Sequence, residues 1–212
     1  GRIRKRNDGT EKVILPVKRK PIHTTQPKAA SKLVRNPVPE IEMAIYEDIL
    51  ETLSSMALVM ERSPSVFADM NEEPLRTILL VALNGIYQGE ATGETFNGAG
   101  KTDILIRHEN KNVFIAECLM WKGAKVLRAK MDDQLFQYAM WRDTKLALVI
   151  FNRGTSFSHV IAEMRKTVGE HPQCIEQLSY QHESGARYRF RRHDDPNQHF
   201  VLTCLAFDVP AT

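Results

Sequence analysis

The chain has 212 residues, of which 42% are hydrophobic and 26% are charged, and its formal net charge is +3 at pH 7. This length suits one domain with a sizeable core plus appendages and argues against two complete domains. No apolar run approaches the roughly 20 residues that cross a bilayer, and the N-terminus lacks an apolar signal core. We therefore expect a cytoplasmic protein without membrane contact.

The charge is distributed unevenly along the chain. Residues 1–37 hold 11 Lys and Arg against two acids and carry +9, whereas residues 38–212 carry −6. Alternating basic and apolar residues around Asn7-Asp8-Gly9 predict a small hairpin, and the stretch from Pro21 to Pro39 has the composition of a linker. The predicted organisation is therefore a basic N-terminal hairpin and linker (1–39) followed by one domain (40–212).

A basic arm of this kind is typical of contacts with nucleic-acid phosphates, because each Lys or Arg placed on a phosphate releases condensed counterions. A solvated linker would have the same composition, so both interpretations stay open. The arm residues that we expect to contact nucleic acid are Arg4, Lys5, Arg6, Lys18, Arg19 and Lys20.

Two amphipathic helices are predicted at the start of the domain. From Glu40 to Glu61, apolar residues recur at helical spacing. A second helix should start near Asn71, which suits an N-cap, and Pro74 is tolerated in its first turn. A glycine-rich segment follows, in which we expect residues 91–97 to form a short strand.

The next two segments predict a β-hairpin. Residues 102–107 and 112–118 are β-branched and apolar, and the residues between them are polar and turn-prone. With the turn centred on Asn110, paired residue numbers sum to 220, so Asp103 lies directly across from Glu117 with Cβ atoms roughly 5 Å apart. Like charges this close are destabilising unless a positive group lies between them, and the plainest candidate is a hard divalent cation.

The rest of the chain continues the alternation of helices and strands. A helix is predicted from Met131 to Arg142, a continuous apolar strand from Lys145 to Phe151, and a further helix from Phe157 to Val168. Three strand-like stretches close the chain, at residues 175–182, 186–192 and 200–207. This order of elements indicates an α/β sandwich on a mixed central sheet.

Motifs for several other chemistries find no support in the sequence. The seven histidines contain no HExxH pair, and the three cysteines lack the spacing of a zinc site. The segment Gly98-Ala-Gly-Lys101 lacks the spacing and the following helix of a P-loop.

The remaining motif resembles the PD-(D/E)XK nuclease superfamily, also called restriction-endonuclease-like. Asp103, 13 intervening residues and then Glu117-Cys118-Leu119 stand between a helix that begins with Glu72-Glu73 and a helix that contains Gln134. The resemblance covers about residues 70–152 and implies an αβββαβ core. The sequence also resembles, more narrowly, an uncharacterised bacterial branch of the superfamily. The stretches that carry this resemblance are Thr92-Gly-Glu-Thr-Phe-Asn97, Gly100-Lys-Thr-Asp103, Val113-Phe-Ile-Ala-Glu-Cys118, Trp121-Lys-Gly123 and Trp141-Arg-Asp-Thr-Lys145.

The resemblance implies a Mg²⁺ or Mn²⁺ ion bound by Asp103 and Glu117, with the backbone carbonyl of Cys118 as a further ligand. Of the helix acids, Glu72 is the expected additional metal ligand and Glu73 the expected assisting catalytic acid. Gln134 is expected beside the metal-bound water or the nucleic-acid backbone. The alternative for both helix acids is simple stabilisation of a helix N-terminus, and for Gln134 it is a polar residue at a helix start.

The sequence departs from the superfamily at Leu119, where a Lys usually helps to activate water. Leu119 lies on the same strand face as Glu117, because side chains alternate with period two, and leucine cannot orient a hydroxide. Lys122 could return to the site if the strand bulges or ends, and Lys101 is another substitute. Both are also expected nucleic-acid contacts. Without such a substitute, the chain would be a weak or inactive catalyst.

The sequence therefore predicts a metal-dependent endonuclease domain that hydrolyses DNA phosphodiester bonds, in bacterial antiphage defence or in DNA repair, and is impaired by Leu119. RNA is an alternative substrate. By resemblance we also expect companion domains or partner proteins, and a homodimer. The rival prediction is a non-catalytic nucleic-acid-binding or protein-interaction module that keeps the nuclease fold.

Overall fold

The computed structural model describes residues 24–25, 40–41, 43–87, 91–97, 100–108, 111–139, 143–154 and 156–209. Side chains of residues 24–25, 40–41, 92, 94–97, 100–101, 107–108, 111 and 113 are outside this description. Strands β1 (Thr24–Thr25) and β2 (Glu40–Ile41) form a small antiparallel ladder. The predicted basic hairpin and its six nucleic-acid contacts lie outside the described residues.

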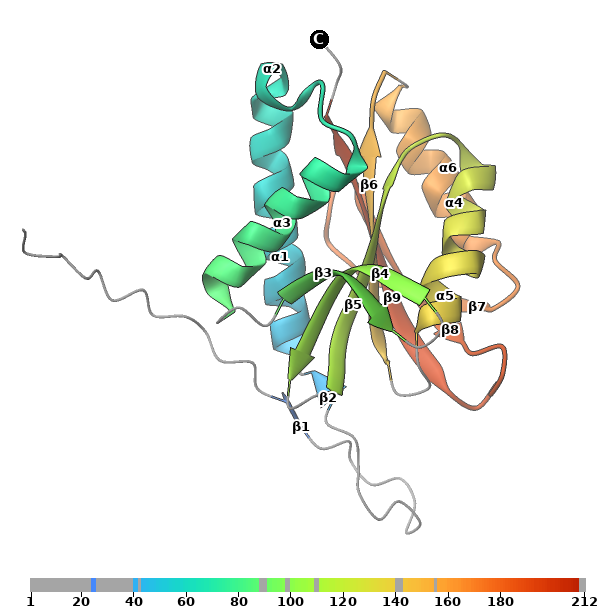
Figure 1. The fold of residues 1–212 in the computed structure, drawn as a ribbon. Coiled ribbons are helices and arrows are strands. Elements are labelled where there is room, and N and C mark those ends of the chain that lie inside the picture. Colours follow the sequence, from blue (N-terminus) through green and yellow to red (C-terminus); the bar gives the residue numbers. More distant parts are fainter. Residues whose placement is uncertain are drawn as a thin grey trace, which may run out of the picture.

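A seven-stranded sheet forms the centre of the domain, with the strand order β3-β4-β5-β6-β9-β8-β7 (Figure 1). Strand β5 is parallel to β6, and β6 is parallel to β9, whereas the other neighbours are antiparallel. The strands span Ala91–Asn97 (β3), Gly100–His108 (β4), Lys111–Met120 (β5), Lys145–Asn152 (β6), Cys174–Leu178 (β7), Gly185–Arg191 (β8) and His199–Asp208 (β9).

Helices cover both faces of this sheet (Figure 1). One face carries α1 (Met43–Arg62), α2 (Pro64–Phe67) and α3 (Glu72–Ile86). The other carries α4 (Ala124–Lys130), the π-helical segment η1 (Met131–Leu135), α5 (Phe136–Tyr138) and α6 (Phe157–Gly169). Each layer buries its own hydrophobic cluster against the sheet, so the central strands β5 and β6 are covered on both sides.

Strand β5 shows how the sequence distributes side chains between the two clusters. Ala116 and Cys118 point toward α1 and α3, whereas Ile115 and Leu119 join the cluster under α4 and α6. This alternation follows from the two-residue period of a strand. Asp103 and Glu117 have odd numbers within the same hairpin and therefore face the α4 side.

The predicted α/β class with a mixed central sheet is confirmed, and each element predicted after residue 40 has a counterpart. Two predictions are wrong in their bounds. The helix expected from Met131 to Arg142 begins seven residues earlier at Ala124, is π-helical over η1, and ends at Tyr138 within the described residues. The strand predicted over residues 175–182 ends at Leu178. In the described part of the chain, no helix combines the length and the apolar character needed to cross a bilayer.

Candidate active site

The β4–β5 hairpin has the predicted register next to the two carboxylates. Ile104 pairs with Ala116 and Leu105 with Ile115, so their numbers sum to 220. A β-bulge after Ile106 shifts the pairing nearer the turn, which is the one departure from the predicted hairpin. In the residue before Ile104, the backbone N–H of Asp103 donates a hydrogen bond to Oε1 of Glu117 at 3.4 Å. The two acids therefore lie next to each other on one face.

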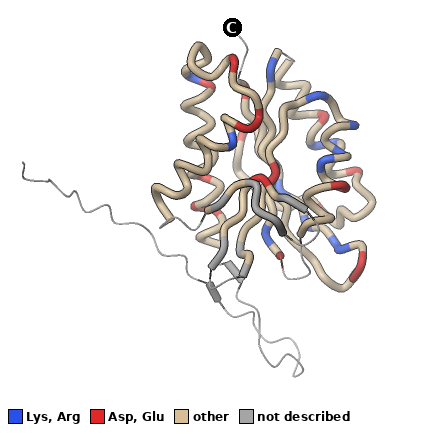
Figure 2. The backbone as a smooth tube through the Cα atoms, in the orientation of Figure 1, with Lys and Arg blue, Asp and Glu red and all other residues tan. Residues whose placement is uncertain are grey.

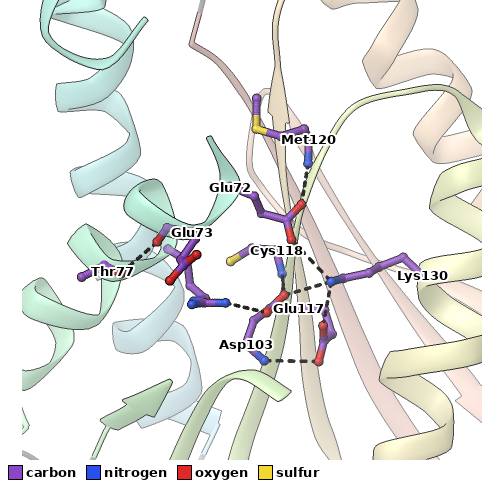
Figure 3. A network of polar contacts seen from close by, with 9 residues as sticks. Glu72, Glu73, Thr77, Asp103, Glu117, Cys118, Met120 and Lys130 are labelled. Atoms are coloured by element: carbon purple, nitrogen blue, oxygen red, sulfur yellow. Dashed lines mark hydrogen bonds and ion pairs between the residues drawn. The ribbon is translucent and has the colours of Figure 1, made fainter. Parts of the chain in front are cut away.

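A lysine from the facing helix layer lies between these carboxylates (Figure 3). Lys130 is the last residue of α4, and its Nζ is 3.0 Å from Oδ2 of Asp103 and 3.0 Å from Oε2 of Glu117. The same Nζ is 3.7 Å from Oε1 of Glu72. The positive group required between the two acids is thus an ammonium supplied by the protein itself.

Asp103 is held by three kinds of donor. Its Oδ1 accepts a hydrogen bond from Nη1 of Arg76 at 3.0 Å, and its Oδ2 accepts one from the backbone N–H of Cys118 at 2.9 Å and one from Lys130. Burial alone would raise the pKa of this carboxyl, but the charge of Lys130 and these hydrogen bonds outweigh burial and hold the pKa below its usual range. Asp103 is therefore a fixed carboxylate.

Glu117 lies in a different environment, because only 1% of its side chain is exposed. Burial, followed by the neighbouring charge of Asp103, raises the pKa of Glu117 to about 8 despite the ammonium beside it. Burial would lower the pKa of Lys130, but Glu117 and Asp103 outweigh that effect and raise it. In this cluster Asp103 is therefore held in its ionised form. Glu117 tends to keep its proton, and a further positive charge nearby would favour its ionised form.

Of the two acids at the start of α3, the structure brings Glu72 to this cluster. Its Oε2 accepts a hydrogen bond from the backbone N–H of Met120 at 3.1 Å, at the end of β5. Glu73 is exposed, and its backbone carbonyl accepts the hydroxyl of Thr77 (Figure 3). No described hydrogen bond or ion pair joins the Glu73 carboxylate to the cluster, so its expected catalytic role finds no support.

Leu119 has the predicted orientation and is only 2% exposed. It packs in the hydrophobic cluster beneath α4 and α6, together with Leu127 and Met131. Lys122 is exposed in the loop after β5 and takes no described part in the cluster, and the side chain of Lys101 lies outside the described residues. Among the described side chains, the lysine that reaches the carboxylates is therefore Lys130, which is not one of the two substitutes expected from the sequence.

Two contributors were missed by the sequence reasoning, namely Lys130 and the buried Arg76 of α3. Gln134 follows Lys130 by four residues on η1 and is partly buried. No described hydrogen bond connects its amide to Asp103 or Glu117.

The donor set of this cluster has the chemistry of a site for a hard cation. Among the described residues, no group of three or more His, Cys, Asp or Glu side chains is arranged to hold a metal ion. Asp103 and Glu117 nevertheless offer adjacent carboxylate oxygens, and Mg²⁺ is commonly held by one or two carboxylates together with water and phosphate oxygens. The raised pKa of Glu117 is consistent with a position that favours added positive charge.

Comparisons with protein-family models, with curated proteins and with solved structures give no significant match. The cluster consists of the buried Glu117 and the partly buried Asp103 on neighbouring strands, a third carboxylate at a helix N-terminus, and two cations from opposite helix layers.

Proposed function

We propose that this chain is a metal-dependent nuclease domain, a divergent member of the PD-(D/E)XK superfamily, in which Lys130 supplies the ammonium that Leu119 cannot. The observation that carries the proposal is the position of the Lys130 Nζ, 3.0 Å from both Asp103 and Glu117. An ammonium next to two adjacent carboxylates on a β-hairpin is the set of groups that hydrolysis of a phosphodiester bond requires.

Each residue of the cluster has a distinct role in this proposal. Asp103 and Glu117 would hold Mg²⁺ or Mn²⁺, which when bound lowers the pKa of a water and polarises the phosphate. Once a metal ion takes up these carboxylates, Lys130 would be free to donate hydrogen bonds to the attacking water or the phosphate oxygens and would offset the negative charge that develops there. Arg76 fixes the orientation of Asp103 from the opposite side of the hairpin.

Glu72 acts as a positioning residue. Because its carboxylate is anchored to the backbone N–H of Met120, it places a negative charge 3.7 Å from the Lys130 ammonium. This charge favours one position of the ammonium among those that the flexible lysine side chain could adopt. We infer that Glu72 orients Lys130 and contributes less to metal binding than Asp103 or Glu117.

The proposed substrate is DNA, with RNA as the alternative. Figure 2 shows Lys and Arg along the side of the molecule that α4 and α6 form, and α4 is also the helix that carries Lys130. The exposed Lys122 and Lys125 lie just before and within α4, so they can contact phosphates that flank the one being cleaved. Bacterial defence or repair, companion domains and a homodimer remain proposals from resemblance.

A cleavage assay with a matched lysine control tests the proposal. The purified chain should nick supercoiled plasmid in Mg²⁺ or Mn²⁺, and Lys130→Met and Asp103→Asn should each lower the rate about a hundredfold or more. Lys125→Met is the control, because Lys125 is exposed on the same helix and has no described ion pair with the cluster. Cleavage that survives Lys130→Met and Asp103→Asn would refute the assignment.

A second function is favoured by one observation. Arg76 and Lys130 already balance the charges of Asp103 and Glu117, so the cluster needs no metal to be stable. A non-catalytic module that binds nucleic acid or a protein could keep such a cluster as a purely structural feature. A wild-type chain that binds DNA or RNA but cleaves neither in Mg²⁺ or Mn²⁺ would establish this alternative.

A further inference from the structure

A concave site lies on the opposite face of the helical layer from Lys130, where it is lined by Arg128 and Asp132. Its cavity, of about 540 Å³, is bounded by η1 and α5, by the loop after α6 and by the loop between β8 and β9. This volume is within the usual range for sites that hold small organic ligands. None of Asp103, Glu117 and Lys130 lines it, so the cavity is separate from the candidate active site.

Aromatic rings form part of the cavity wall. The Phe136 ring lies 5.2 Å, between centroids, from both the Phe200 ring and the His171 imidazole. All three residues line the cavity, and Phe136 is only partly buried. Phe200 is 5% exposed and the His171 side chain 2%, so the ring contact open to a planar ligand is with Phe136.

Polar groups of both kinds surround these rings. Arg128 Nε donates to Asp132 Oδ2 at 2.7 Å, and Arg192 Nε donates to Asp194 Oδ1 at 3.0 Å. All four side chains line the cavity, together with the exposed amide of Gln137. Because each guanidinium is paired with a carboxylate, the lining is close to neutral, which disfavours a bare anion and suits a ligand with both donors and acceptors.

The Asp132 carboxylate is fixed in orientation by a second donor. Nδ1 of His171 accepts the backbone N–H of Gln173 at 3.0 Å, so the imidazole proton is on Nε2, which donates to Asp132 Oδ1 at 2.8 Å. Burial lowers the pKa of His171, and the hydrogen bonds from His171 and Arg128 outweigh burial to lower the pKa of Asp132. The cavity thus presents an ionised acceptor with unused lone pairs next to aromatic rings.

We propose that this cavity binds a nucleobase, taken either from a free nucleotide or from an unpaired position of a nucleic-acid strand. A purine or pyrimidine base is planar, is nearly neutral, and carries N–H donors and carbonyl or ring-nitrogen acceptors along one edge. Carboxylates, amides and guanidinium groups are the side chains that read such edges, and aromatic rings bind the base faces. The proposed site goes beyond cleavage and does not depend on it.

Calorimetric titration in EDTA tests this site. The probes are the four nucleoside monophosphates, ribose 5-phosphate, and short single-stranded homopolymers. At least one nucleotide should bind saturably and ribose 5-phosphate should not. Affinity for a homopolymer well above that for its mononucleotide would identify a strand as the source of the base, and equal affinities would identify free nucleotides.

Two variants and a matched control locate the binding. Asp132→Asn and Gln137→Ala should each weaken nucleotide binding by about tenfold. Glu176→Gln should leave it unchanged, because Glu176 is a similarly exposed carboxylate that pairs with Arg189 away from the cavity. The proposal is overturned if no nucleotide or homopolymer binds, if ribose 5-phosphate binds as tightly as the nucleotides, or if neither variant differs from the control.

Discussion

Replacing Lys130 by Met provides a test of the cluster that does not require activity. The ammonium is 14% exposed and lies 3.0 Å from each of two carboxylates, one of which is almost fully buried. Removing one partner of such a cluster leaves uncompensated buried charge, which usually destabilises a protein by about 3 to 5 kcal/mol. For a domain of this size, a loss of that magnitude corresponds to a fall in Tm of roughly 6 to 20 °C.

The loss of stability should depend on pH in a definite direction. The pKa of Glu117 is about 8 in the folded chain and 4.5 in the reference state, so between these values the folded chain binds more protons and its stability falls as pH rises. Without Lys130 the folded pKa of Glu117 rises further, so the fall in stability continues to a higher pH at the same slope. We expect the loss caused by Lys130→Met to be larger at pH 8.5 than at pH 5.5, where Glu117 is protonated in both proteins, by up to about 1 kcal/mol.

Urea denaturation in EDTA at the two pH values measures this difference, with Lys125→Met as the control. Adding Mn²⁺ should restore part of the stability of Lys130→Met at pH 8.5, by about 2.7 kcal/mol at a concentration one hundred times its Kd. Equal losses for Lys130→Met at both pH values, or a loss at pH 8.5 no larger than that of the control, would refute the role of the ammonium between the carboxylates.

Three further perturbations follow from the same geometry. Leu119→Lys, which introduces the lysine of the motif that the sequence resembles, should destabilise the chain by about 3 kcal/mol in urea denaturation, because the position is buried under α4. It should also fail to raise the rate of plasmid nicking, because Lys130 already supplies an ammonium. Glu117→Gln should flatten the fall in unfolding free energy between pH 5 and pH 8, which denaturation at several pH values would show. Removing residues 1–37 should weaken DNA binding and reduce the slope of log affinity against log salt concentration; an unchanged slope would show that the arm makes no phosphate contacts.

The hairpin was predictable because its geometry depends only on local rules. Side-chain alternation and the residue numbers across the turn placed Asp103 next to Glu117, and the structure has this register from Ile104 to Ile106. The bulge near the turn was not predicted, and it leaves the pair unchanged because it lies on the other side of Ile106. The sequence also predicted something positive between the acids, with a divalent cation as the plainest candidate. The structure places the Lys130 ammonium there, and the metal ion stays a prediction.

Lys130 was missed because the predicted helix began at Met131, whereas α4 begins at Ala124. The apolar spacing of Leu127, Met131 and Leu135 continues the buried stripe back to the first turn of α4, and this signal could have extended the predicted helix. Gly123, with φ of +103°, precedes the first turn in a conformation that glycine readily adopts. The π-helical turns of η1 add a local rotation that a strict 3.6-residue period does not predict.

Arg76 was missed for a different physical reason. A charged residue on an amphipathic helix is expected on the solvent side, yet Arg76 adjoins the buried residue Leu75 and is itself buried. Its burial is tolerated because Asp103 accepts its hydrogen bond, and that partner is 27 residues away on another element. A pairing of this range depends on how α3 packs against the sheet, which single-sequence patterns do not specify.

Supplying the ammonium from α4 changes what controls its position. On a strand, a lysine at position 119 would be fixed by the backbone of the same hairpin that carries Asp103 and Glu117. Lys130 is instead fixed by the packing of α4 and η1 on the sheet, and Leu119 is part of the hydrophobic cluster that holds them there. Leu119 therefore takes part in placing Lys130, and substitutions in that cluster should alter the position of the ammonium before they alter the two carboxylates.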